Sequence, residues 1–180
     1  MGTDMPEQSQ SWKTPQNFLI LISIIVPIAF SSWMALLNNF VIEKANFDGS
    51  DIGLLQSVRE IPGFLAFTVV FVLLFIREQR FMLVSLAMLT AGTAITGLFP
   101  SLFGLLMTTL LMSTGFHYFE TINKSLTLQW IEKTETPHFM GRAMAVKAAG
   151  SLLAYSGIWL LMEWVDTLKS FTMFFAWVLT

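Results

Sequence analysis

Five ionisable side chains stand inside long apolar segments of this sequence, where charge is otherwise rare. An ionisable group inside a bilayer is costly, so it usually faces a protein interior or a water-filled cavity. Such residues bind solutes, carry protons or hold helices together through ion pairs. The five candidates for these roles are Arg59, Glu60, His117, Glu120 and Lys147.

The positions of these residues within their segments predict which of them meet. Glu120 comes late in a segment expected to enter from outside, and Lys147 comes early in one expected to enter from the cytoplasm. Both then fall in the inner half of the membrane, so we expect a Glu120–Lys147 salt bridge. Arg59 and Glu60 fall in the outer half. Because neighbouring residues on a helix point about 100° apart, we expect these two not to pair with each other.

Each candidate has two interpretations, and the sequence leaves both open. Arg59 and Glu60 either lock helices together or contact a solute or a coupling ion. The Glu120–Lys147 pair is either a structural or gating salt bridge or a solute contact. His117 either carries a proton, since histidine ionises nearest neutral pH, or is a hydrogen-bonded interior residue.

Polar residues at helical spacing extend this group along three segments. The stripes are Thr109, Ser113, His117, Glu120 and Lys124; Ser23, Pro27, Ser31, Met34 and Asn38; and Lys147, Ser151 and Tyr155. A protein that only filled a membrane would gain nothing from continuous polar stripes, whereas a translocation cavity needs them. Ser31 and Asn38 therefore join the candidates for solute or proton contact, and the alternative is that they form hydrogen bonds across helices.

The segments that carry these residues are predicted to be membrane helices. The sequence of 180 residues is 54% hydrophobic and 12% charged, against about 25% charged residues in an ordinary soluble domain. A membrane helix needs about 20 mostly apolar residues. We therefore expect an all-α, polytopic transmembrane bundle with five full spans and an incomplete sixth, at about 18–40, 51–76, 81–99, 101–123, 139–164 and 170–180.

Several local features are predicted within this bundle. Ser50 or Asp51 is expected to cap the second span, and Pro62–Gly63 to kink it. The stretch at 124–136 is expected to be a separate amphipathic segment at the membrane surface. The third span has no ionisable residue and is expected to face lipid. Small residues on the third and fifth spans predict close helix contacts: Ala91, Gly92, Ala94, Gly97, Gly141, Ala145, Ala148, Ala149 and Gly150.

Basic residues in the loops predict the orientation, because Lys and Arg collect on the cytoplasmic side. Six lie on one side, namely Lys13, Arg77, Arg80, Lys124, Lys133 and Arg142, and two on the other, namely Lys44 and Lys169. The polar tail at 1–17 is therefore expected in the cytoplasm. We expect a multi-pass protein of the plasma membrane, which in bacteria is the inner membrane.

Composition and motifs argue against several other classes of protein. The chain has no cysteine, and its two histidines, His117 and His138, have no partner at metal-ligand spacing. No nucleotide-binding, protease or hydrolase motif occurs, so we expect no cofactor, no metal and no enzymatic activity. No basic run is present, so nucleic acid is not an expected partner. The expected surroundings are the lipid bilayer and a small-molecule solute.

Local sequence resembles the major facilitator superfamily of transporters. Residues 33–63 are similar to the family's first helix, outer loop and second helix, with Ile52, Gly53, Leu55 and Ser57 matching an "IG.L.S" run. The resemblance implies two six-helix bundles with three-plus-three repeats, of which this chain would supply the N-terminal one. The missing C-terminal half is then an expected partner. In this family the first and fourth helices line the cavity, and the second and fifth meet the other half.

The chain also departs from the family pattern. Between the second and third helices the family has a Gly and an Asp with basic residues, whereas residues 75–81 here read FIREQRF. Arg77 and Arg80 keep the basic charge, but the latch attributed to that motif is in doubt.

The leading hypothesis is a secondary transporter of a small solute that works by alternating access, with proton coupling as one expectation. Because the chain stops within the sixth segment, we expect it to be an N-terminal fragment. The alternative is a membrane-embedded assembly or accessory protein that transports nothing alone.

Overall fold

Helices make up the computed structural model, which describes residues 14–168, with side chains to residue 164. They are α1 (Pro15–Glu43), α2 (Gly49–Phe64), α3 (Val69–Leu73), α4 (Glu78–Ile95), α5 (Leu102–Trp130) and α6 (Thr136–Leu168). Short 3₁₀ helices, η1 (Leu65–Thr68) and η2 (Thr96–Leu98), follow α2 and α4. The described residues contain no strand, which confirms the all-α prediction.

Five helical stretches are long and apolar enough to cross a membrane, which indicates a multi-pass membrane protein. They are Pro15–Glu43, Gly49–Leu73, Glu78–Leu98, Leu102–Trp130 and Thr136–Trp164. The second of them joins α2, η1 and α3 into one span. The predicted tail at 1–17 lies almost wholly outside the described residues, and the predicted incomplete span at 170–180 lies wholly outside them.

The fourth span is longer than predicted, because α5 does not end near residue 123. It continues to Trp130, so the expectation of a separate amphipathic segment at 124–136 was wrong. The apolar face persists through the extra turns, since Ile122 and Leu126 are buried. The polar side chains of the same turns also have partners on α4, because Ser125 and Gln129 donate hydrogen bonds to the Glu78 carboxylate.

The second span starts earlier than predicted and is capped by Asp48 rather than by Ser50 or Asp51. Asp48 Oδ1 accepts hydrogen bonds from the amides of Ser50, at 2.8 Å, and Asp51, at 2.9 Å. The Asp51 carboxylate in turn accepts from the Asp48 amide, which completes a capping box. Further along, the helix changes to the 3₁₀ form of η1 within a turn of Pro62–Gly63, where the kink was predicted.

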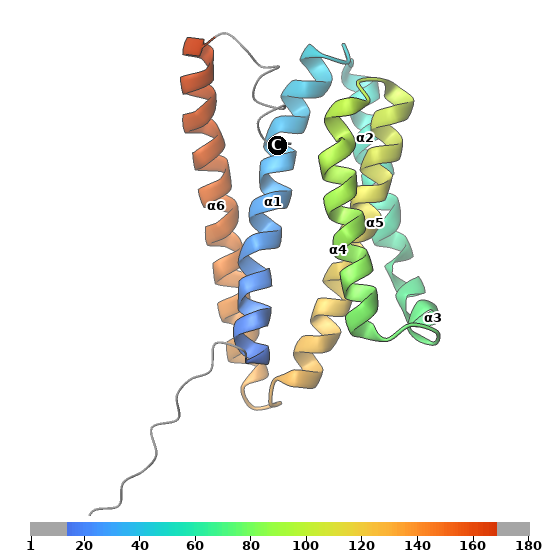
Figure 1. Ribbon diagram of the computed structural model, residues 1–180, viewed down its shortest axis with the longest axis vertical. Coiled ribbons are helices and arrows are strands. Elements are labelled where there is room, and N and C mark those ends of the chain that lie inside the picture. Colours follow the sequence, from blue (N-terminus) through green and yellow to red (C-terminus); the bar gives the residue numbers. More distant parts are fainter. Residues whose placement is uncertain (1–13, 169–180) are drawn as a thin grey trace, which may run out of the picture.

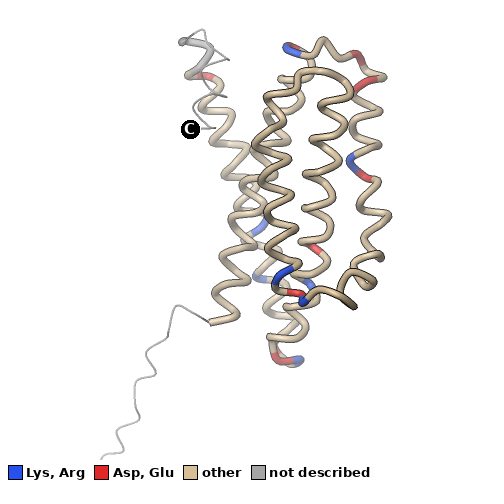
Figure 2. Tube along the Cα trace, turned by 45° about the vertical axis from the view of Figure 1, so that its right-hand side comes forward, with Lys and Arg blue, Asp and Glu red and all other residues tan. Residues whose placement is uncertain are grey.

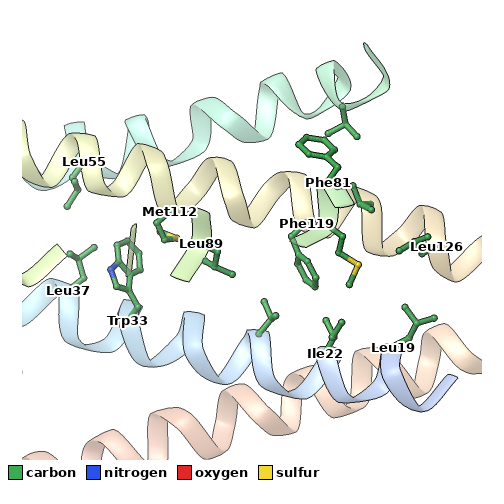
Figure 3. Packing of buried hydrophobic residues seen from close by; sticks show 14 of the residues in the cluster. Leu19, Ile22, Trp33, Leu37, Leu55, Phe81, Leu89, Met112, Phe119 and Leu126 are labelled. Carbon is green, nitrogen blue, oxygen red and sulfur yellow. The ribbon is translucent and has the colours of Figure 1, made fainter. Parts of the chain in front are cut away.

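The helices pack in two groups: α2 and α4 lie beside α5, and α1 lies beside α6 (Figure 1). Figure 3 shows apolar side chains of α1 and α5 meeting between these two helices, among them Trp33 and Met112. Phe30 of α1 stacks on Phe116 of α5, with ring centroids 4.2 Å apart. The indole of Trp33 donates a hydrogen bond of 3.1 Å to Thr96, which links α1 to η2.

Small residues allow the closest of these contacts. A Cβ added to Gly92 would stand 2.5 Å from the Met112 backbone nitrogen, and one added to Gly150 would stand 3.2 Å from the Ile24 carbonyl oxygen. The prediction of close contacts is confirmed at these two glycines. It was wrong for Gly141, where an added Cβ would meet nothing within 4 Å.

The third span is more buried than the second and fifth spans, and its orientation toward lipid stays a prediction. In its most apolar stretch 33% of residues are buried, against 17% for the second span and 11% for the fifth. The reason is the close packing of α4 on α5, which buries one side of α4. Large apolar side chains such as Phe64 and Phe75 are exposed around the second span, as contact with lipid requires.

Candidate functional site

Three candidate spans bring the five ionisable side chains of the sequence analysis together. We call Arg59 and Glu60 of α2, His117 and Glu120 of α5, and Lys147 of α6 the polar cluster. Figure 2 shows that the other charged residues lie mostly toward the two ends of the bundle. The polar cluster is thus the main concentration of charge within the described spans.

Arg59 and Glu60 form an ion pair, although they are neighbours on α2. Arg59 Nε and Nη2 donate to the same Glu60 oxygen at 3.0 and 2.8 Å. The expectation that these residues would not pair was wrong, because both side chains are long enough to bend toward each other from diverging Cβ atoms. Arg59 Nη1 also lies 3.0 Å from Met34 Sδ, which places the guanidinium against α1.

The Glu120 carboxylate of α5 forms ion pairs with two lysines. Lys147 of α6 donates to Glu120 Oε1, and Lys124 Nζ lies 3.5 Å from Glu120 Oε2. The structure therefore brings together the Glu120–Lys147 pair that helix depth predicted, and it adds Lys124. The Glu120 side chain is 18% exposed, against 34% for Lys147 and 64% for Lys124. Glu120 is thus the enclosed member of a group with one more positive than negative charge.

His117 connects the two ion pairs. It comes one turn before Glu120 on α5, and its ring lies against the α2 backbone at Gly63, one turn after Glu60. One turn earlier on α5, Ser113 donates a hydrogen bond to the carbonyl oxygen of Arg59, which fixes α2 against α5 at this level. Within the described residues no hydrogen bond engages the imidazole ring of His117.

The candidates on α1 lie apart from the polar cluster. Ser31 is buried and Asn38 is exposed, and in the described part of the chain no hydrogen bond or ion pair links either of them to the cluster. Met34, the stripe residue between them, makes the contact instead. The outer part of the α5 stripe is likewise enclosed, since Thr109 is fully buried and its hydroxyl has no partner. The buried Thr109 and Ser113 of this stripe face neighbouring helices.

A glycine that the sequence analysis assigned only to a kink positions His117. A Cβ on Gly63 would stand 3.0 Å from His117 Cε1 and 3.3 Å from Nε2, so the ring lies directly on the α2 backbone. The adjacent proline was the only signal at this position, and it indicated helix geometry and not a contact. Gly63 is therefore a positioning residue for the imidazole.

Replacing Gly63 with alanine is expected to move the His117 ring by a few tenths of an ångström. The chain has two histidines, so ¹⁵N-histidine NMR of the protein in micelles or bilayers reports on the ring directly, with His138 as the internal reference. We expect the His117 resonances to shift in Gly63→Ala and to stay in place in Gly53→Ala, because a Cβ on Gly53 meets nothing within 4 Å. Equal spectra for the two variants would show that Gly63 does not position the ring.

No group of three or more His, Asp or Glu side chains in the described residues is placed to hold a metal ion. Comparison of the chain with family models, with curated proteins and with solved structures finds no match.

Proposed function

We propose that this chain is part of a transporter that carries a small polar solute across a membrane by alternating access, with the polar cluster contacting the solute or a coupling proton. The observation that carries the proposal is the meeting of five ionisable side chains from three candidate spans. They form two ion pairs, and between these pairs along α5 lies an imidazole ring that has no hydrogen-bond partner among the described residues.

The energetics of buried charge support this role. Replacing a buried ion pair with well-packed apolar residues is often neutral or stabilising. The Glu120–Lys147 pair is partly buried, with its side chains 18% and 34% exposed, so a bundle that only filled the membrane would gain little from it over apolar side chains. Two ion pairs and a histidine within the spans therefore favour a functional role, and solute recognition and proton transfer are the roles that these side chains can perform.

The finer assignment is also a proposal. The chain would be the N-terminal half of a transporter like those of the major facilitator superfamily, with its N-terminus in the cytoplasm and the plasma membrane as its location. Two features support it beside the resemblance of residues 33–63. The second and fifth spans are the most exposed of the five, which leaves them free to meet another half. The two halves together would enclose the solute.

Alternating access predicts that the cluster is open to each side of the membrane in turn, which cysteine labelling can test without knowing the solute. The chain has no cysteine, so a Ser151→Cys variant of the complete natural protein, cleared of any other cysteine, reports on one position. Ser151 lies one turn after Lys147 and is half-buried. A membrane-impermeant maleimide is expected to label it from both sides of sealed vesicles.

The matched control is Leu152→Cys, whose apolar side chain is 67% exposed and should face lipid or the other half, not water. We expect little labelling of this variant from either side. Labelling of Ser151→Cys from one side only, or from neither, would contradict alternating access and favour a membrane-embedded assembly protein.

A further inference from the structure

A groove of about 360 Å³ lies at one end of the bundle, away from the polar cluster. It is formed where α3 ends, α4 begins and α5 ends, at the bottom of Figure 1. Three candidate spans terminate here, so the groove lies at the boundary between membrane and water. Its walls combine an apolar part, Leu73, Ile76 and Leu126, with Arg77, Gln129 and the indole of Trp130.

The charges of the groove are not all available to a ligand. Glu78 also lines it, but both of its carboxylate oxygens already accept hydrogen bonds from α5, one from Ser125 at 3.0 Å and one from Gln129 at 2.7 Å. Arg77, in contrast, is exposed, and no hydrogen bond or ion pair engages its guanidinium within the described residues. Glu78 keeps its negative charge, but both of its oxygens are turned toward α5, so the Arg77 guanidinium is the charged donor of the groove that stays open to a ligand.

We propose that this groove binds an anionic phospholipid, whose phosphate pairs with Arg77 while an acyl chain lies along Leu73, Ile76 and Leu126. A guanidinium suits a phosphate because it offers two parallel hydrogen bonds. Trp130 suits the same boundary, since indole rings collect where headgroups meet acyl chains. The occupant is a lipid and not a soluble anion, because the apolar wall continues directly from Arg77 toward the exposed side chains of Leu74 and Phe75.

This proposal does not depend on transport, and fluorescence quenching tests it. The complete protein is reconstituted in vesicles of phosphatidylcholine with increasing fractions of phosphatidylglycerol, with bromine on the acyl chains of one lipid or the other. The difference in quenching between the native protein and Trp130→Phe isolates the signal of Trp130. One basic residue near an anionic surface is worth about fivefold in affinity. We therefore expect the quenching of Trp130 to report an affinity of the groove for phosphatidylglycerol about fivefold higher than for phosphatidylcholine.

Arg77→Gln is expected to abolish that preference, whereas Arg142→Gln should retain it. Arg142 is also an exposed arginine, lies at the start of α6 and does not line the groove, so it controls for the loss of one surface charge. Millimolar inorganic phosphate should not reduce the quenching, because the acyl chain contributes to binding. Equal quenching by the two lipids in the native protein, or equal losses in the two arginine variants, would overturn the proposal.

Discussion

Gly115→Ala is expected to separate α4 from α5 and to cause the largest loss of stability among alanine replacements of the glycines that the structure describes. A Cβ at this position would clash with the Leu89 backbone nitrogen and would stand 2.5 Å from the Ser85 carbonyl oxygen. Both atoms belong to the backbone of α4, so no side chain can turn aside. Overpacking of this kind costs about 1–3 kcal/mol, and we expect the upper end of that range because a whole helix must shift.

Unfolding of the purified protein by SDS in mixed micelles measures this loss. The control is Gly141→Ala, where an added Cβ meets nothing within 4 Å. Alanine is favoured over glycine within a helix by about 1 kcal/mol, so this control should be neutral or slightly more stable than the native protein. Equal destabilisation by both changes would mean that α4 and α5 are not in close contact.

Gly92 allows the same contact from the other helix, because its added Cβ would press on the backbone of Met112. Once one methyl group has pushed the helices apart, the second meets less resistance. The double variant Gly92→Ala/Gly115→Ala should therefore lose less free energy of unfolding than the sum of the losses in the two single variants.

These glycines also show what the sequence can and cannot predict about the fold. Hydropathy located all five spans of the described region, since a run of about 20 apolar residues is a strong signal. Small residues marked Gly92 and Gly150 as contact points, but Gly115 was overlooked, and Gly141 looks the same in sequence and touches nothing. Which face of a helix meets a partner depends on the rotation of both helices, and one sequence does not encode that rotation locally.

The sequence predicted the contacts of the site that depend on how deep each residue lies in its helix. It missed the contacts that depend on the length and flexibility of the side chains. Glu120 and Lys147 meet because two antiparallel helices place them at the same level. Arg59 and Glu60 meet although their Cβ atoms diverge, because their flexible side chains span the difference. The Met34 and Gly63 contacts have no chemical signature of their own, since they arise from the shape of the packed bundle.

The Glu120 carboxylate is expected to be essential for transport and important for stability. Glu120→Gln leaves the ammonium groups of Lys147 and Lys124 without a counter-charge at this level of the bundle. Breaking a fully buried pair costs about 3–5 kcal/mol. Because Lys147 is 34% exposed and can reach polar surroundings, we expect a smaller loss of about 1–3 kcal/mol. The variant should still insert into the membrane.

The double variant Glu120→Gln/Lys147→Met separates a structural salt bridge from a working carboxylate. Removing the lysine with the acid removes the unpaired charge, so stability against SDS should return close to the native value. If the pair only locks α5 to α6, access to Ser151→Cys from both sides of the membrane should return as well. We expect access from both sides to remain lost, because in our proposal the carboxylate itself must bind and release a proton or solute as the cluster changes sides. Full recovery of two-sided labelling in the stable double variant would assign Glu120 a structural role and leave His117 and the Arg59–Glu60 pair as the remaining candidates for transport.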